Sequence, residues 1–232
     1  MTIPKTNEIE RRLLPEGELR VATKDEKDVI EGQSSVFGQF SEDLGGWTEI
    51  IEQGFFDDVL AGDTRALFNH NADYVLGRTT NQTLELSQDA KGLNDRIYPP
   101  DTQWARDLLI SLRRGDITQQ SFSFRLKRLA NGDGMDGDEW IVEGDKIIRR
   151  LLKGGCKELY DVSPVTFPAY PQTSVSADTR SRFEEFRTKS NPDPSMAAPG
   201  GAVVPEPVPD VMAVQQELQA NRRRRLELAE KS

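Results

Sequence analysis

Hydrophobic and polar residues alternate in many short runs between Glu18 and Pro171, and this pattern predicts a strand-rich fold. A period of two places successive side chains on opposite faces of a strand, so that one face can join a core. The runs are ELRVAT, DVIEGQSSVFG, WTEIIEQ, TRALFNH, QTLELSQDA, QQSFSFRLKRL, EWIVEGDKIIRRLL and ELYDVSPVTFP. The segment KGLNDRIYPPD mixes turn residues with apolar ones and receives no assignment.

Two segments have helical patterns instead. GFFDDVLAG predicts a short helix. A longer helix is predicted where Trp104, Leu108 and Leu112 recur at i, i+4 and i+8, and Gly115 gives it a natural end. Two helices among many strands predict an α+β fold that is mostly β.

The composition changes after Pro171. Six of the 13 prolines fall in NPDPSMAAPGGAVVPEPVPD, where Pro, Ala and Gly bury too little apolar area to offset the entropy of ordering. We therefore predict four regions, which are an N-terminal extension at 1–17, a main domain at 18–180, a mostly disordered Pro-rich linker at 181–210 and a helical tail at 211–232. The block from Arg222 to Arg225 in the tail is either a solvated helical face or a site for a partner or DNA.

Composition also narrows the classes of function. A net charge of −9 argues against sequence-independent binding of nucleic acid, since such proteins present excess Lys and Arg to phosphates. Cys156 is the only cysteine, so no intramolecular disulfide can form. We find no apolar run of about 18 residues that could span a membrane, and the N-terminus lacks the apolar run of a signal peptide. We expect a protein of the cytosol.

His70 is the only histidine. With one His and one Cys the chain lacks the ligand sets that zinc sites use, and we expect neither a metal nor a cofactor. NGDGMDGDE superficially resembles a calcium loop but lacks the carboxylate spacing and closing Glu of an EF-hand, so we predict a hairpin loop there. Any histidine acid–base chemistry near neutral pH must use His70.

Three extended segments hold the polar residues that a nucleophilic site needs. Ser121 and Ser123 share one strand face, and the phenylalanines beside them share the other. A serine hydroxyl needs a base, which in turn benefits from an acidic orienting group, and His70, Ser121 and Asp161 supply these parts. Each of these residues also has a purely structural interpretation. His70 would share the strand face of Phe68 and lie in the core, the two serines would lie on a solvated sheet face, and Asp161 would pair with an arginine.

Three motifs, taken in order, resemble those of tailed-phage prohead maturation serine proteases. FNHNADYVLGRT is similar to the family stretch in which an aromatic residue, Asn and His precede Leu-Gly-Arg. QSFSFRL is similar to the strand that carries the nucleophilic serine, and ELYDVSPVTFPAYPQT is similar to the closing signature of the family. The likeness covers about residues 18 to 180. It implies His70 as base, Ser121 as nucleophile and Asp161 as third member, with Glu158 as a competing acid.

The resemblance also implies the fold of herpesvirus assemblin, a closed β-barrel surrounded by helices. One departure is Ser123, which stands two residues after the nucleophile where relatives usually have Gly. Donors for the oxyanion come from the main chain and leave no mark in a sequence. Arg125 or Arg78 either assists these main-chain donors or serves as a structural ion-pair partner.

The implied function is that of a serine endopeptidase that cleaves scaffold, part of the major capsid protein and its own ends through an acyl-enzyme on Ser121. The implied location is the host cytoplasm, inside the assembling prohead of a phage or prophage, with a homodimer by analogy. Two alternatives stay open. One is a catalytically inactive scaffolding protein with the protease fold, which Ser123 in place of Gly would fit; the other is a binding module with His70 in its core.

Overall fold

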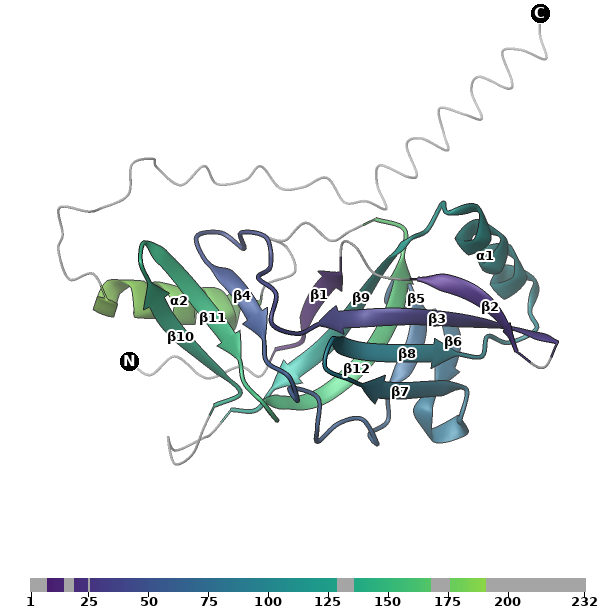
Figure 1. Ribbon diagram of the computed structural model, residues 1–232, viewed down its shortest axis with the longest axis horizontal. Helices are drawn as coiled ribbons and strands as arrows, with labels where there is room; N and C mark the ends of the chain where they lie inside the picture. The colour runs from purple at the N-terminus through teal and green to yellow at the C-terminus, as the bar shows by residue number, and fades with distance from the viewer. Residues whose placement is uncertain (1–7, 15–18, 25, 129–135, 168–175, 191–232) are drawn as a thin grey trace, which may run out of the picture. The chain divides into compact units, whose positions relative to one another are not determined.

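The structure of the protein is a computed structural model that describes residues 8–14, 19–24, 26–128, 136–167 and 176–190. Within these residues the chain is mostly β, with two α-helices, and its strands form three sheets (Figure 1). The α+β, mostly β class predicted from the sequence is confirmed.

The largest sheet has five strands. In spatial order these are β1 (Glu10–Leu14), β9 (Gln119–Leu126), β12 (Cys156–Val165), β5 (Arg65–Phe68) and β6 (Asn71–Arg78). A four-stranded sheet contains β2 (Arg20–Lys24), β3 (Lys27–Val36), β8 (Gly92–Ile97) and β7 (Leu84–Gln88), and a three-stranded sheet contains β10 (Asp138–Glu143), β11 (Lys146–Leu151) and β4 (Thr48–Ile51). The helices are α1 (Gln103–Arg114) and α2 (Ala177–Ser190), with a short 3₁₀ helix, η1 (Thr79–Asn81).

The five-stranded and four-stranded sheets share one hydrophobic core. Phe122 and Phe124 of β9 are buried there, and each packs edge-on against another buried phenylalanine at a centroid distance of 5.5 Å. Ile97 of β8 belongs to the same cluster. Because the phenylalanines fill this core, alternation along β9 turns Ser121 and Ser123 to the opposite face.

The longer predicted helix is confirmed as α1. Leu108 and Leu112 are buried, and Trp104 packs against the core. The helix ends before Gly115, whose φ of 78° lies in the left-handed region and whose N–H donates to the carbonyl of Leu112 at 3.1 Å. The apolar spacing and the terminal glycine were therefore sufficient to locate this helix.

The predicted helix at GFFDDVLAG is wrong. Residues 53–61 form a series of turns, in which the N–H of Val59 donates to Phe56 at 3.0 Å and that of Gly62 to Val59 at 2.9 Å. These bonds reach back three residues, not the four of an α-helix. Gly54, with a φ of 86°, lies outside the helical region and opens the series.

The structure adds detail at one unassigned segment and one predicted run. KGLNDRIYPPD contains strand β8, which pairs with both β3 and β7. EWIVEGDKIIRRLL, predicted as one extended run, is a hairpin in which Glu143 opposes Lys146. Gly144 has a φ of 62°, which a two-residue hairpin loop requires and which glycine adopts without strain.

The predicted closed β-barrel is not found. β1 and β6 are the edges of the five-stranded sheet, and β2 and β7 are the edges of the four-stranded one. A barrel needs a continuous hydrogen-bonded ladder around its circumference, and no ladder within the described residues joins these two sheets. The buried side chains of the shared core hold them together instead.

The predicted N-terminal extension, 1–17, contains a strand of the main sheet. β1 pairs antiparallel with β9, so that Leu13 lies opposite Ser121. Glu10 and Arg12 of β1 are buried. This segment was missed because its apolar residues are few and its buried residues are charged.

The predicted linker does not begin at 181, because α2 continues to Ser190. Phe183 of this helix packs against Trp47, with ring centroids 4.5 Å apart, and is buried. Most of NGDGMDGDE, the remaining linker and the predicted helical tail at 211–232, with its arginine block, lie outside the described residues.

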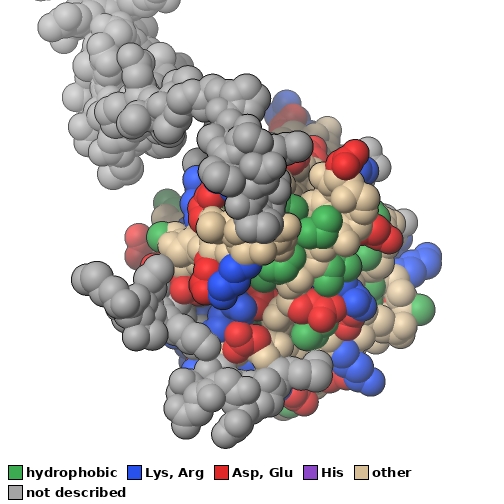
Figure 2. All heavy atoms as spheres, turned by 90° about the vertical axis from the view of Figure 1, so that its left-hand side faces the viewer, with side chains coloured by type: hydrophobic (Ala, Val, Ile, Leu, Met, Phe, Trp, Pro, Cys, Tyr) green, Lys and Arg blue, Asp and Glu red, His purple; other side chains and the backbone are tan. Residues whose placement is uncertain are grey.

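The face of the molecule seen in Figure 2 carries acidic and basic side chains intermixed, with apolar side chains between them. The described part of this face shows no continuous basic patch of the kind that binds phosphates. Within the described ranges, no helix is both long and apolar enough to cross a membrane.

Candidate active site

Three neighbouring strands arrange polar side chains in two rows across the five-stranded sheet. In one row, Arg11 of β1, Ser123 of β9 and Asp161 of β12 are register partners. In the next row, Ser121 of β9 lies opposite Ser163 of β12. Side chains that oppose one another in neighbouring strands point to the same face. Both rows therefore lie on the face turned away from the phenylalanine core.

His70 reaches this face from a tight turn between β5 and β6. Phe68 pairs with Asn71, so that Asn69 and His70 form a two-residue hairpin loop. Their φ angles are 55° and 56°, as a type I′ turn requires at both central residues, and Asn and His are among the residues enriched in this region. The interpretation of His70 as a core residue on the strand face of Phe68 is therefore wrong.

Asn69 fastens this turn to the end of β12. Its backbone N–H donates to the carbonyl of Pro164 at 3.0 Å. Its side-chain oxygen accepts the N–H of Thr166 at 2.8 Å, and its amide nitrogen donates to the Thr166 hydroxyl at 3.1 Å. The turn with His70 is thus held by the strand that also carries Asp161.

The structure brings all three predicted site residues together. Nε2 of His70 lies 2.8 Å from Oγ of Ser121, and Nδ1 of His70 lies 2.6 Å from Oδ1 of Asp161. The two ring nitrogens therefore face a hydroxyl on one side and a carboxyl on the other. This is the arrangement in which an imidazole can take a proton from serine while an acid holds the ring in place.

Asp161 is well supplied with hydrogen bonds. Ser163 donates to its Oδ1 at 2.6 Å. Burial alone would raise the pKa of Asp161. Hydrogen bonds from His70, Ser163 and Ser123 and the charge of an imidazolium at His70 together outweigh the effect of burial, so the pKa of Asp161 lies below its ordinary value. An ionised carboxylate only accepts hydrogen bonds, so Nδ1 of His70 carries a hydrogen and Nε2 is the free acceptor beside Ser121.

The serines do not lie on a solvated face. Ser121 and Ser123 are each 1% exposed, and the His70 side chain is 13% exposed. Little water therefore competes for their hydrogen bonds, and the low local dielectric strengthens them.

Glu158, the competing acid, lies elsewhere. Its carboxylate accepts a hydrogen bond from Arg125 at 3.4 Å and another from the hydroxyl of Tyr160. The guanidinium of Arg125 also stacks over the Tyr160 ring, 5.1 Å from its centroid. Arg78 donates twice to Asp63, at 2.7 Å each. Both arginines therefore have the ion-pair partners that their structural interpretation requires.

Cys156, the only cysteine, is unsuited to act as a nucleophile. It is buried, and this burial raises the pKa of its thiol to about 12, so that it carries no thiolate near neutral pH. The described residues also contain no group of three or more His, Cys, Asp or Glu side chains placed to hold a metal ion.

Two residues of the site escaped the sequence analysis. Asn69 had a usable signal, because an Asn in a dipeptide between two extended runs is typical of a two-residue hairpin turn. Arg11, whose Nε donates to Oγ of Ser123 at 3.3 Å, had none, because 112 positions separate the two residues.

The match to a protein family agrees with the resemblance noted in the sequence. Residues 16–188, more than half of the chain, match the family described as caudovirus prohead serine protease. Among solved structures, the bacteriophage T4 capsid assembly protease gp21 is similar with a TM-score of 0.34 and 10% identity, over 67% of this chain and 98% of that chain. No curated protein matches the chain.

Proposed function

Because the chain belongs to the caudovirus prohead serine protease family, we propose that it is a serine endopeptidase with Ser121 as nucleophile, His70 as general base and Asp161 as the group that orients His70. One observation carries this assignment, the unbroken chain of contacts from Asp161 through both nitrogens of His70 to Ser121. The positions come from three separate parts of the sequence, as is usual for triads.

In the proposed reaction, Nε2 of His70 takes the hydroxyl proton of Ser121 while Oγ attacks the carbonyl carbon of the scissile bond. When the tetrahedral intermediate collapses, its C–N bond breaks and His70 returns the proton to the departing amine. Water then attacks the acyl-enzyme, again with His70 as base, and releases Ser121. Base assistance of this kind contributes roughly 10² to 10⁴ in rate.

Asp161 supports each proton transfer. Its carboxylate accepts the Nδ1 hydrogen and keeps Nε2 available, and it stabilises the imidazolium that forms when His70 is protonated. The lowered pKa of Asp161 favours this role, because the acid remains ionised well below neutral pH. A hydrogen bond from Ser163 to Oδ1, the same oxygen that faces the imidazole, helps to hold the carboxylate in place.

We propose prohead components as substrates, namely scaffold, part of the major capsid protein and the chain's own ends. The site of action is then the assembling prohead in the host cytoplasm. The burial of Ser121 fits an enzyme that must stay inactive until assembly, when the groups covering the hydroxyl are displaced. A homodimer is one way to displace them.

The Pro-rich segment 191–210 is the proposed place of self-cleavage, because a composition rich in Pro, Ala and Gly predicts a linker, and linkers are preferred sites of proteolysis. The segment 211–232 is then a disposable docking element that brings the enzyme into the particle. A mature particle that contains the protease with residues 211–232 intact contradicts this part of the proposal.

Intact-mass spectrometry tests the proposed function. Wild type, Ser121→Ala and Ser35→Ala are each incubated alone and with the capsid protein encoded beside this chain. Ser35 is a matched control, a buried strand serine whose hydroxyl has no hydrogen-bond partner among the described residues. Cleavage by wild type and Ser35→Ala, but not by Ser121→Ala, supports the proposal. Equal cleavage by all three refutes Ser121 as nucleophile, and no cleavage under assembly conditions favours an inactive scaffolding protein.

A further inference from the structure

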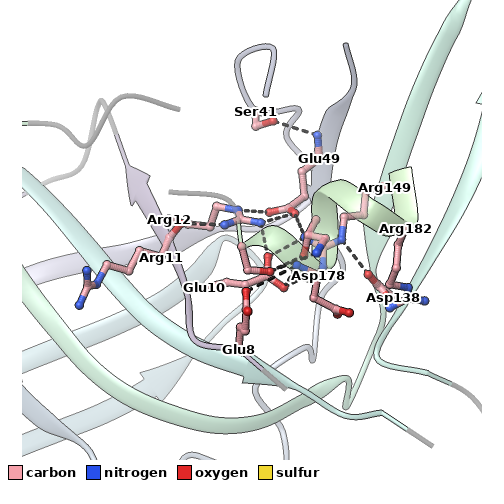
Figure 3. A network of polar contacts seen from close by, with 12 residues as sticks. Glu8, Glu10, Arg11, Arg12, Ser41, Glu49, Asp138, Arg149, Asp178 and Arg182 are labelled. Carbon is pink, nitrogen blue, oxygen red and sulfur yellow. Dashed lines mark hydrogen bonds and ion pairs between the residues drawn. The ribbon is translucent and has the colours of Figure 1, made fainter. Parts of the chain in front are cut away.

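A buried network of ion pairs holds β1 in place from the core side (Figure 3). Arg149 of β11 donates to both carboxylate oxygens of Glu10, at 2.7 and 2.9 Å, and to Glu49 of β4 at 2.9 Å. Arg12 of β1 donates to Glu49 at 2.5 Å and to Glu10 at 2.7 Å. Its guanidinium lies 5.5 Å from the centroid of the Phe124 ring. Strands of the five-stranded and the three-stranded sheet therefore meet in one set of buried charges.

The first turn of α2 reaches the same network. The hydroxyl of Thr179 donates to Glu10 at 3.0 Å, and Thr179 is fully buried. The backbone N–H of Asp178 donates at 3.5 Å to the carboxylate of Glu8, which lies just before β1. In the sequence, 169 positions separate Thr179 from Glu10. The segment that leads into β1 and the last helix of the described chain therefore bind each other directly.

Further along α2, a charged and an aromatic side chain attach the helix to the three-stranded sheet. Arg182 donates at 2.8 Å to Asp138 of β10, whose carboxylate is fully buried. The ring centroid of Phe183 lies 4.5 Å from that of Trp47 and 5.8 Å from that of Trp140. Separating α2 from the sheet would expose these rings to water and take a partner from a buried carboxylate. Both changes are unfavourable.

β1 covers one edge of β9, the strand with the proposed nucleophile. Among the described strands, β9 pairs with β1 on one side and with β12 on the other, and Leu13 of β1 lies opposite Ser121. If β1 moved away, the backbone of β9 beside Ser121 would lose its ladder, and the freed N–H and C=O groups would be open to water or to other chains. Because α2 and β1 share the buried network, the attachment of α2 helps to hold β1 on β9.

Proteolysis of a folded segment requires that the segment opens. Cleavage then depends on the fraction of time that the segment is locally unfolded, so a well-bonded segment is cut slowly. Cleavage within β1 or α2 would first require the contacts of Glu10, Thr179 and Phe183 to break. The composition of 191–210 predicts a linker instead, and linkers are preferred sites of proteolysis. The two kinds of segment should therefore differ strongly in their rates of self-cleavage.

We propose that the buried network sets the limits of self-processing. The chain hydrolyses bonds at its own ends only before Glu8 and after Ser190, and α2 is retained as a clamp that keeps β1 on β9. Each cut adds one water and leaves a new carboxylate and a new amine, as in the reaction above. This inference rests on the proposed function and deepens it, because it states which of the chain's terminal bonds are substrates.

Hydrogen–deuterium exchange tests the clamp without any catalysis. In full-length Ser121→Ala, Phe183→Ala should loosen α2 and speed exchange of the β1 amides about tenfold, while the amides of β7 and β8 stay unchanged. Phe40→Ala is the matched control, because Phe40 is 58% exposed and lies outside α2. It should leave exchange in β1 unchanged. If the β1 amides stay as protected in Phe183→Ala as in the parent, the clamp is refuted.

A milder variant keeps the test decisive if Phe183→Ala unfolds throughout. Thr179→Val keeps the shape of the side chain but removes its hydrogen bond to Glu10. The loss of one net hydrogen bond should speed exchange of the β1 amides about fivefold. Thr188→Val is the control, at an exposed threonine of the same helix whose hydroxyl donates to the carbonyl of Glu184. Equal exchange of the β1 amides in the two threonine variants refutes the clamp.

Intact-mass spectrometry of self-processed wild type gives the second readout. We expect the longest-lived product to begin at or before Glu8 and to end at or after Ser190. In an otherwise wild-type chain, Phe183→Ala should add cuts within α2, and Phe40→Ala should not. A wild-type product that lacks β1 or α2 and still cleaves the capsid protein overturns the inference.

The clamp and the proposed function fail in different ways. If wild type does not cleave but Phe183→Ala speeds exchange in β1, the clamp stands, and self-processing is refuted together with the proposed function. If wild type cleaves, Ser121→Ala does not, and β1 keeps its protection in Phe183→Ala and Thr179→Val, the protease assignment stands and the clamp is refuted.

Discussion

Two polar clusters lie on opposite faces of the β1–β9 pair, and they differ in kind. The network around Arg149 joins carboxylates to guanidinium groups. The pKa values of Glu10 and Asp138 are lowered and those of Arg12 and Arg149 are raised, so these four groups keep their charges near neutral pH. The cluster around His70 joins one carboxylate to an imidazole and hydroxyls. Imidazole is the side chain suited to accepting and returning protons near neutral pH.

The difference indicates a division of labour within one sheet. A buried ion network with fixed charges holds its strands in one register, because separating any member leaves an unpaired charge in the core. A cluster that contains an imidazole can change its protonation without breaking the fold. Changes in the first cluster should therefore lower stability, and changes in the second should lower activity.

The largest expected effect is on activity. Asp161→Asn keeps the shape of the acid but presents a donor, which favours the wrong tautomer of His70, and kcat should fall about 10⁴-fold with little change in unfolding. Rates of capsid-protein cleavage measure this. Glu158→Gln, the same change at the competing acid, should stay within about twofold of wild type. Comparable losses in the two variants contradict the assignment of Asp161.

The next effect is on stability. Arg149→Met leaves Glu10 and Asp138 buried without their shared cation and should reduce the free energy of unfolding by about 3–5 kcal/mol. Urea unfolding in the Ser121→Ala background measures this loss without self-cleavage. Arg150→Met, at a neighbouring and partly exposed arginine with surface partners, should cost about 1 kcal/mol or less. Equal costs for the two arginines contradict the division of labour.

A third polar cluster sharpens the comparison, because its acid, Asp95, has no ion-pair partner among the described residues. Asp95 accepts hydrogen bonds from Ser34 at 2.5 Å and Gln120 at 2.8 Å, and burial raises its pKa to about 6 from the ordinary 3.8. Its folded pKa lies above its unfolded value, so its stabilising contribution is complete below pH 3.8 and is lost as the pH rises through 6. The loss amounts to about 3 kcal/mol by pH 8.

Asp95→Asn should therefore stabilise the protein by about 2–3 kcal/mol at pH 8 and change it little at pH 4. The difference between the variant and its parent in urea unfolding at several pH values gives the result. Gln120 can turn its amide, whose oxygen has no hydrogen-bond partner among the described residues, toward the new donor. A pH-independent difference contradicts the account of Asp95.

The smallest effect concerns the turn that presents His70. Asn69→Gly keeps the positive φ but removes the side-chain bonds to Thr166, and should cost about 1 kcal/mol or less because these bonds are exposed. Asn69→Ala, which also disfavours the left-handed backbone, should cost more by about 1 kcal/mol. Thermal unfolding of both variants gives the comparison. Equal losses of stability in the two variants contradict the claim that residue 69 must adopt the left-handed backbone conformation.

Local signals in the sequence predicted much of the framework. Alternation located β9 and placed Ser121 and Ser123 on one face, and the spacing of Leu108 and Leu112 located α1. Each depends only on neighbouring residues. The closed barrel, which the family resemblance implied, was wrong. Closure of a barrel depends on which sheet edges pair, and no local pattern in the sequence carries that information.

Charged segments were harder to predict. β1 looked like an extension because Glu10 and Arg12 are polar in the sequence and buried in the structure. Arg149, the partner of Glu10, is 139 residues away, and Glu49, a partner of Arg12, is 37 residues away, so no local pattern predicts these pairs. The three residues proposed for the site lie together in the structure. The hairpin turn that places His70 there could have been predicted only by recognising Asn69 as a turn residue.

The most direct test of the central claim is to label the nucleophile. The chain is incubated with capsid protein and a fluorophosphonate probe, which forms a P–O bond with an activated serine and releases fluoride. Peptide mapping then locates the adduct. The account predicts one adduct, on Ser121, which is absent when His70 is replaced by Gln. An adduct on Ser123, or labelling of Ser121 that persists in His70→Gln, contradicts it.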